Sequence, residues 1–501
     1  MPRARYSAWA QISDPIIGDA QAIPFRRMHF FGLSEISDIF LLNLRETIMK
    51  NKQLSERKRK RVQKHLEQIN LFAAGIDIGS REHYVAVPES LAKESVRVFS
   101  CFTSDLESMA DWLVQIGITT VAMESTGIYW IPAFEILESR GLEVILVNAR
   151  HVKNVSGRKT DVKDCQWIQQ LHTYGLLAGA FRPEDHYCVL RAYMRQREML
   201  VSSIAVTIQH MQKSLRQMNL LLDNVVTDIT GQTGVRIIRA ILSGERDAKK
   251  LASFRDGRCK SSLEEITQSL LGNYRKEHLF TLKQSVELYD TYHTKLKDCD
   301  REIENQLDEL EKQPASTSLP AKNRRKKNNQ NAMKFNVVNY LYEICGTDLT
   351  EIDGLDEHSV LKIVSETGVN MDKWETEKHF VSWLGLSPNN KISGGKILSS
   401  KTIKTQNRAK QVFKLAAFAL SNSKSGLGAF YRRIRARLGA PKAINATARK
   451  VAIIFYNMIK FKTAFRSQTQ EEYDELNKKR IMKNLKQKAK QFGLELVPMT
   501  A

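Results

Sequence analysis

The sequence lacks any long hydrophobic run. No stretch of its 501 residues approaches the ~20 consecutive apolar residues that a membrane-spanning helix needs. The N-terminus shows no basic segment leading into an apolar stretch and a cleavage site, so we expect neither secretion nor insertion into a membrane. A hydrophobic content of 42% is nevertheless enough to give each domain a buried core, which excludes a wholly disordered chain.

Cysteine is scarce and scattered. No two of the six cysteines form a Cys-x-x-Cys pair, and their long separations indicate neither a zinc site nor a disulfide framework. They are typical of reduced thiols. We therefore expect a cytoplasmic protein, associated with the nucleoid when active.

Acidic residues are outnumbered by basic ones. The chain has 77 Lys and Arg against 55 Asp and Glu, which leaves a net charge of +22 at pH 7. A basic excess is most often used to neutralise phosphates, so we expect a nucleic-acid partner. Charge kept only for solubility would explain a smaller excess better than this one.

The first 68 residues show no clear period. We interpret residues 1–68 as an N-terminal extension that is either disordered or lies ahead of the true start, for which Met28 and Met49 are alternatives. A basic run at 52–64 favours a solvated tail or linker over a specific nucleic-acid arm.

An α/β pattern follows, which predicts a domain at 69–182. Short β-rich runs alternate with amphipathic stretches, and the segment ends in a helix that begins near Asp161. The predicted strands lie at 71–79, 83–88, 95–101, 119–123 and 143–148, and the other helices near 104–116 and 128–140. Three strands followed by alternating helices and strands indicate a mixed sheet. RNase H-like (RuvC-like) nuclease folds use this order.

Two heptad series predict long helices between 183 and 313. In the first, apolar residues recur every seventh residue, a second set fills the interleaved positions, and Arg197 interrupts the seam. The first series is Met194, Val201, Ile208, Leu215 and Leu222, interleaved with Ile204, Met211 and Met218, and the second is Leu282, Tyr289, Leu296, Ile303 and Leu310. Such narrow stripes are typical of coiled coils. They leave two alternatives open, namely packing within one chain and association into a homo-oligomer, a dimer or tetramer.

The rest of the chain divides by composition. Residues 314–335 combine Pro, Ser, Asn and a basic cluster and are interpreted as a linker. A mostly helical domain at 336–470 and a charged helical tail at 471–501 follow. The turn at Ile352–Leu355 has a weak likeness to a phosphate-binding helix-hairpin-helix, but we favour a plain helical turn.

Four carboxylates carry the strongest chemical signal. Asp77 stands in the first strand, where a charge must be paired or bound to a cation to offset its desolvation, and Glu124 ends the fourth strand. Asp161 and Asp164 are three residues apart on one face at the start of a helix. Each has an ordinary explanation alone, but converging acids repel one another unless hard cations bridge them. The set predicts a site for two Mg²⁺ ions ~4 Å apart that assist phosphoryl transfer.

A second constellation surrounds a serine. Ser393 precedes two glycines that let the backbone approach a phosphate, and nearby lysines would stabilise a pentavalent phosphorus. The flanking cations are Lys391, Lys396, Lys401 and Lys404. An ordinary Gly/Ser turn is the alternative, and Ser387, Ser399 and Ser400 compete as nucleophiles.

A basic patch lies farther along the chain. Arg432, Arg433, Arg435 and Arg437 follow Tyr431 within ten residues of the sequence AFYRRIRARL. Closely spaced arginines with an aromatic neighbour are suited to phosphate contacts.

These motifs together resemble a known family. GIDIG, the run from MESTGIYW to KTDVKDCQW, and HFVSWLGLSPNNKISGGK are similar to the DEDD insertion-sequence transposases that have a RuvC-like N-terminal domain and a serine-bearing C-terminal domain. This group, now called bridge-RNA-guided recombinases, includes the pilin-gene invertases. The similarity runs from about Leu71 to the C-terminal tail, and residues 1–68 depart from the usual pattern.

The resemblance implies a mechanism and partners. It implies that acids matching Asp77, Glu124, Asp161 and Asp164 bind Mg²⁺, and that a serine matching Ser393 attacks DNA and becomes covalently linked to it. It further implies sites assembled between subunits, and a noncoding bridge RNA that pairs with donor and target DNA. Two other functions stay open from the residues themselves: a RuvC-type metal-dependent junction nuclease with water as nucleophile, and a non-catalytic nucleic-acid-binding scaffold.

Overall fold

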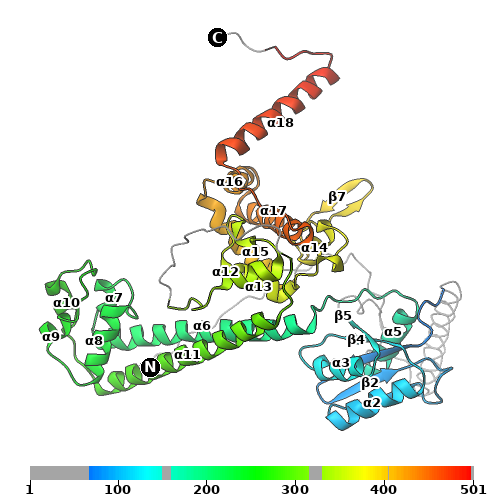
Figure 1. Ribbon diagram of the computed structural model, residues 1–501, viewed down its shortest axis with the longest axis horizontal. Coiled ribbons are helices and arrows are strands. Elements are labelled where there is room, and N and C mark those ends of the chain that lie inside the picture. The colour runs from blue at the N-terminus through cyan, green and yellow to red at the C-terminus, as the bar shows by residue number, and fades with distance from the viewer. Residues whose placement is uncertain (1–66, 149–159, 315–329, 404, 498–501) are drawn as a thin grey trace, which may run out of the picture. The chain divides into compact units, whose positions relative to one another are not determined.

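The chain folds into two compact units that meet in sequence between Phe181 and Arg182. The computed structural model describes residues 67–148, 160–314, 330–403 and 405–497 (Figure 1). Nearly all of the predicted N-terminal extension, most of the predicted linker at 314–335, and Lys404 lie outside the described residues. Each unit is described by itself below.

A five-stranded mixed sheet forms the centre of the first unit, as the sequence predicts. The strand order is β3-β2-β1-β4-β5. β1 pairs antiparallel with β2 and parallel with β4, β2 pairs antiparallel with β3, and β4 pairs parallel with β5. The strands are β1 Ala73–Ile78, β2 Glu82–Ala86, β3 Val96–Ser100, β4 Thr120–Glu124 and β5 Glu143–Val147.

Helices cover both faces of this sheet (Figure 1). α2 (Thr103–Gln115) and α3 (Trp130–Ser139) bury their apolar sides against one face, where they share a core with Ala74, Ile76 and Ile78 of β1. α5 (Asp161–Thr173) packs on the opposite face. Because strand residues alternate between faces, Gly75 and Asp77 point toward α5.

Gly75, which has no side chain, allows α5 to lie very close to β1. A Cβ added to Gly75 would be 2.2 Å from the backbone nitrogen of Gln169 and 2.6 Å from the backbone oxygen of Cys165. The helix is also fastened by polar contacts, since Gln169 Nε2 donates to Ala73 O at 3.4 Å and His172 Nε2 lies 2.9 Å from Thr120 Oγ1. Burial lowers the pKa of His172, so this ring bonds as a neutral imidazole.

Two long helices begin the second unit. α6 (Asp185–Gln217) and α11 (Lys276–Glu309) pack side by side along their length (Figure 1). Most predicted seam residues are buried, whereas Val201 and Ile208 are only half buried because the buried stripe of α6 also takes in Leu200 and Thr207. The helix pair therefore packs within one chain, and association through it with a second subunit stays a prediction.

Arg197, which interrupts the heptad, belongs to the seam. It is 3% exposed, and its Nε donates to Asp300 Oδ1 of α11 at 2.6 Å. Its Nη2 donates to the backbone oxygen of Asn331, also at 2.6 Å. The interruption is thus a buried ion pair between the two helices.

Short helices join the ends of this pair. Ser262 and Glu265 form a capping box at the start of α10, so local sequence fixes where that helix begins. The elements are α7 Leu222–Val225, α8 Gln232–Leu242, α9 Ala248–Ala252 and α10 Leu263–Ser269.

The C-terminal part is mostly helical, with one small hairpin. Its core gathers aromatic rings, among them Phe380, Phe413, Phe455 and Tyr456. The elements are α12 Val337–Cys345, η1 Leu349–Glu351, α13 Glu357–Thr367, η2 Met371–Lys373, α14 Glu377–Trp383, β6 Lys391–Ser393, β7 Lys396–Ser399, α15 Arg408–Ala419, η3 Leu420–Asn422, α16 Gly426–Leu438, α17 Ala440–Phe461 and α18 Gln470–Gln491.

The turn at Ile352–Leu355 serves packing in this unit. Gly354 has a φ of +88°, and an added Cβ would lie 2.9 Å from Ala416 O of α15. Ile352 and Leu355 are buried. These contacts favour the plain helical turn over a phosphate-binding hairpin.

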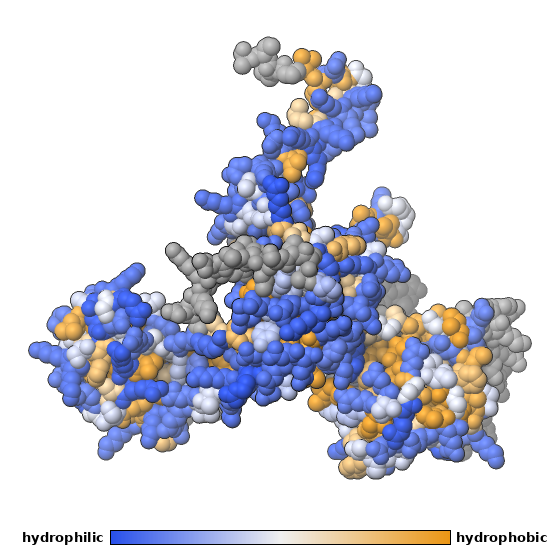
Figure 2. Space-filling view, viewed as in Figure 1, coloured by the Kyte–Doolittle hydropathy of each residue, from blue (hydrophilic) through white to orange (hydrophobic). Residues whose placement is uncertain are grey.

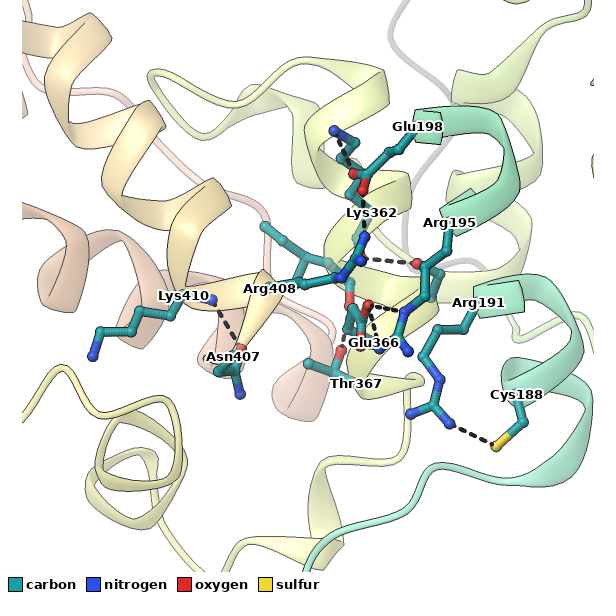
Figure 3. Close-up of polar contacts among 12 residues, drawn as sticks. Cys188, Arg191, Arg195, Glu198, Lys362, Glu366, Thr367, Asn407, Arg408 and Lys410 are labelled. Atoms are coloured by element: carbon teal, nitrogen blue, oxygen red, sulfur yellow. Dashed lines mark hydrogen bonds and ion pairs between the residues drawn. The ribbon is translucent and has the colours of Figure 1, made fainter. Parts of the chain in front are cut away.

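Ion pairs fasten α6 to the C-terminal helices (Figure 3). Glu198 of α6 contacts Lys362 of α13 at 2.7 Å and Arg408 of α15 at 2.5 Å. Arg195, one turn away, makes a bidentate contact with Glu366 of α13 at 2.8 and 2.9 Å. Bidentate Arg–carboxylate pairs fix orientation as well as distance, so they hold α6 against this helical part.

In the part of the chain that the structure describes, we find no helix with the length and apolar character needed to span a bilayer.

Candidate functional site

Three of the four predicted acids converge beside β1. Asp77, Asp161 and Asp164 each offer a carboxylate oxygen, and these oxygens lie within 4.8 Å of one another. Asp161 is exposed and the other two are half buried. The side chain of Thr160 accepts from Lys163 N, which sets the start of α5 and places both helix acids in its first turn.

Glu124, the fourth predicted acid, lies next to this group but is not one of its members. Met123 pairs with Ile76 in the parallel β1–β4 ladder, so Glu124 is level with Asp77 and on the same face. Its Oε1 accepts a hydrogen bond from Thr126 Oγ1 at 2.8 Å, which turns the carboxylate toward the following loop.

Tyr84 and Cys165 also lie beside the acids, and the sequence alone did not identify them. Tyr84 pairs with Asp77 across β1 and β2, and its hydroxyl donates to Glu82 Oε2 at 3.3 Å. The negative charge of Glu82 raises the pKa of Tyr84, and Asp161 and Asp77 add to the effect. The phenol therefore stays a neutral donor at the edge of the site. Its position opposite Asp77 could have been found by aligning the first two predicted strands.

Cys165 is the second residue beside the acids. It follows Asp164 in α5 and is fully buried. Burial raises the pKa of its thiol to about 12, with a further contribution from the charges of Asp77 and Asp164. Its Sγ donates to Val162 O at 3.1 Å, so this thiol packs rather than reacts.

The acid group fits a divalent metal by donor type. Its three donors are carboxylate oxygens, the ligands that hard cations such as Mg²⁺ prefer, and their mutual distances suit a shared ion. Three negative charges this close repel unless a cation offsets them. Asp77, Asp161 and Asp164 are thus the residues that would hold a divalent cation.

Ser393 lies at the tip of an exposed β-hairpin in the second unit. It ends β6, and the turn to β7 consists of Gly394 and Gly395, with φ of +53° and +75°. Two successive residues in the left-handed region are the requirement of a tight hairpin turn, which glycine meets without strain. The predicted Gly/Ser loop is therefore the turn of a hairpin.

The hairpin brings one predicted lysine next to the serine. Ser393 and Lys396 are directly opposite one another in the ladder, and both are exposed, as are Lys391 and Lys401. Of the competing serines, Ser399 is half buried and its Oγ accepts from Lys401 N at 3.4 Å.

The predicted arginine patch lies on α16 and divides into two kinds of side chain. Arg432 is half buried, donating to the backbone oxygens of Ser421 and Ser423 at 3.1 and 2.7 Å and to Gln470 Oε1 at 2.9 Å. These bonds give Arg432 a structural role. Arg433 and Arg435 are exposed, so they are the better candidates for contacting a phosphate.

Comparison with known proteins agrees with this arrangement. Residues 74–220, which hold all four acids, match a family model for DEDD transposases of the IS110 type, described as "Transposase". Residues 346–432, which hold Ser393 and its hairpin, match the model "Transposase IS116/IS110/IS902 family". No curated protein matches the chain.

The two matched regions are those of a transposase, an enzyme that cuts and rejoins DNA. Both models describe transposases of the IS110 type, and residues 74–220 and 346–432 are similar to them.

Proposed function

We propose that this transposase is a site-specific DNA recombinase in which Ser393 is the nucleophile and the acids beside β1 hold Mg²⁺. The convergence of Asp77, Asp161 and Asp164 is the observation that carries the proposal. The strand order β3-β2-β1-β4-β5, with β1 antiparallel to β2 and parallel to β4, supports an RNase H-like fold for the first unit.

The proposed reaction is a pair of phosphoryl transfers. Ser393 Oγ attacks a DNA phosphorus, a P–O bond to the serine forms, and the bond to one deoxyribose oxygen breaks as that oxygen takes up the proton. A hydroxyl of the new DNA end then attacks the phosphoserine and releases the serine. The number of phosphoester bonds is unchanged, so rejoining needs no energy source. A bound divalent cation would supply electrostatic stabilisation of the charge that develops on the oxygens.

The hairpin supports a nucleophilic role for its serine. Ser393 is exposed, and Lys396 beside it can stabilise negative charge on the attacked phosphate. Lys391 and Lys401 add positive charge at the base of the hairpin.

The test is a search for a covalent protein–DNA adduct. Ser393→Ala is expected to keep nucleic-acid binding but to yield no adduct on a denaturing gel. Ser400→Ala, which removes an exposed serine just beyond β7, is the matched control and should form the adduct normally. An undiminished adduct in the Ser393→Ala protein would overturn the assignment.

A junction nuclease is the second candidate, because the acid group lies within one unit and contains no serine. Water would then be the nucleophile, and cleavage would occur without attachment to protein. Cleavage that persists in Ser393→Ala but disappears in Asp161→Asn would favour it. Absence of any reaction by the unaltered protein at all Mg²⁺ concentrations would favour a non-catalytic scaffold.

We further propose that a noncoding bridge RNA guides target choice. The net charge of +22 and the similarity to IS110-type transposases support this step. Sequencing of RNA that copurifies with the protein, compared with the DNA flanking its gene, tests it. A structured flanking transcript enriched in the preparation is the expected result.

A further inference from the structure

A group of cations that has no acidic partner among the described residues lies where α16, α17 and α18 meet. Arg433 comes from α16, Lys450 from α17 and Arg480 from α18. The guanidinium of Arg433 lies 5.7 Å from the ring centre of Phe430 and 5.4 Å from that of Tyr473. Lys450 Nζ lies 5.0 and 5.7 Å from the same two rings. Two cations therefore share one pair of aromatic rings.

The charges in this group reinforce rather than cancel one another. Burial lowers the pKa of Lys450, and the positive charges of Arg480 and Arg433 lower it further. Arg433 donates to Asn477 Oδ1, a neutral acceptor. Among the residues that the structure describes, neither Lys450 nor Arg480 forms an ion pair.

A buried hydroxyl points to a ligand for the group. Tyr473 is 8% exposed, and its Oη has no hydrogen-bond partner of ordinary geometry within the described ranges. Burial raises the pKa of Tyr473, while the charges of Arg433 and Arg480 act in the opposite direction. Arg480 follows Tyr473 by seven residues in α18, so the two side chains leave the same face of that helix. A buried hydroxyl without a partner costs free energy, which an anion accepting its hydrogen would recover.

The helix that continues from this group is strongly basic. Every charged residue of α18 after Glu475 is Lys or Arg, and of these only Lys479 has an ion-pair partner in the described part of the chain. The exposed surface of α18 is accordingly mostly hydrophilic (Figure 2). The cation group thus begins a positive track along an exposed helix.

We propose that Arg433, Lys450, Arg480 and the hydroxyl of Tyr473 form a binding site for one phosphate of a nucleic-acid backbone. The site deepens the proposed function, on which it rests, by naming where DNA or RNA contacts the second unit away from Ser393. Cation–π packing alone would hold the three helices together, but it would leave the hydroxyl unsatisfied and the cations without counter-charge.

The first test measures the salt dependence of binding. The double variant Lys450→Met, Arg480→Gln is compared with the full-length protein on a labelled DNA duplex and on an RNA hairpin, in EDTA so that no cleavage occurs. Loss of one phosphate contact should reduce the slope of log K against log[salt] by about 1 and weaken binding about tenfold at low salt. The variant Lys450→Arg, Arg480→Lys should bind as the unaltered protein does.

A matched control removes two exposed cations elsewhere. The double variant Lys283→Gln, Arg301→Gln lowers the net charge by the same amount as the test variant. Its two side chains lie on α11 and are 64% and 69% exposed, respectively, so the slope of log K against log[salt] should not change. A slope change confined to DNA or to RNA identifies the source of the phosphate. Unchanged binding of both by the Lys450→Met, Arg480→Gln protein overturns the site, as does loss of binding to polyglutamate alone, which would indicate an acidic protein partner.

Tyr473→Phe provides an independent readout. Because the Tyr473 hydroxyl forms no hydrogen bond of ordinary geometry among the described residues, its removal should not lower the melting temperature, whereas binding should weaken about fivefold. Equal affinity of Tyr473→Phe and the unaltered protein would contradict the site. If the unaltered protein bound neither nucleic acid, the proposed function itself would fail; if it bound both and no variant differed, only this inference would fail.

Discussion

Gly75 decides how the acid group is assembled. It lies two residues before Asp77 on the same face of β1, at the point where the backbone of α5 crosses the strand. Only a residue without Cβ allows the approach that brings the first turn of α5 to Asp77. The glycine therefore acts on the site through helix position, without touching a ligand.

Gly75→Ala is expected to destabilise the first unit and to loosen the acid group. A Cβ at 2.2 Å from Gln169 N forces α5 to shift, which should cost about 1–3 kcal/mol, as overpacked cores do. Thermal unfolding and Mn²⁺ titration would show a lower melting temperature and weaker metal binding. Gly257→Ala is the control, since an added Cβ there meets nothing within 4 Å, and both measurements should be unchanged. Full metal affinity in Gly75→Ala would contradict this role.

His358 predicts a dependence of stability on pH. Burial lowers its pKa to about 4, and the nearby charges of Arg197 and Lys362 contribute in the same direction. Asp356 and Glu198 oppose them. Between pH 6.5 and 4 the unfolded chain binds a proton that the folded chain does not, so stability should fall as the pH falls through this window and stay level above it.

Urea unfolding at pH 7 and pH 5 measures this effect. His358→Gln should reduce the loss of stability between the two pH values by about 1–2 kcal/mol. His379→Gln, at a side chain that is 59% exposed, is the control and should leave the loss as it is. An identical pH dependence in the His358→Gln protein would show that the ring is not held neutral.

At the scale of elements, the α6–α11 pair is specified by a polar contact as well as by its apolar seam. Arg197 and Asp300 face one another from the two helices, where they are 3% and 8% exposed. A buried ion pair adds little net stability, but it penalises any register in which either charge lacks its partner. The ion pair thus fixes the register of α6 against α11.

Arg197→Leu should be strongly destabilising because it leaves Asp300 buried without its cation. We expect a loss of about 3–5 kcal/mol in the free energy of unfolding, of which Arg197→Leu with Asp300→Leu together should recover most. The exposed pair Arg239–Asp290 is the control, and Arg239→Leu should cost less than about 1 kcal/mol. Equal losses in the single and double variants at the buried pair would refute this interpretation.

At the scale of the whole molecule, the proposed catalytic groups belong to different units. The acids lie in the unit that ends at Phe181, and Ser393 lies in the unit that begins at Arg182. A site that needs groups from both can be completed by different copies of the chain, as the family resemblance implies. Division of this kind would restrain cutting by unassembled protein.

Mixing two inactive variants tests this division. Asp161→Asn and Ser393→Ala should each abolish recombination, and a mixture of the two should recover a measurable fraction, because an intact first unit of one copy can serve an intact second unit of another. The recombination product is measured by amplification across the new DNA junction. Activity at background in the mixture, with normal activity when unaltered protein is mixed with Ser393→Ala, would rule out sites shared between copies.

The elements of the first unit and the grouping of its acids were predictable from local sequence patterns. The five strands and the helices between them lie where alternation and helical period placed them, since these patterns report which face of each element is buried. The convergence of Asp77 with Asp161 and Asp164 was also predictable, because strand β1 and the helix packed on it meet at one edge. Their chemical character follows from residue type alone.

The sequence by itself determined the basic charge, the order of elements and the positions along the chain of the four acids and Ser393. Only the tertiary structure decided that Glu124 bonds to Thr126 outside the acid group, that Arg197 fits within the seam it interrupts, and that cations of three helices gather around Tyr473. Each of these depends on a rotamer or on side chains far apart in sequence. Periodicity reports which face a residue occupies, whereas the partner it meets there is set by how the faces pack.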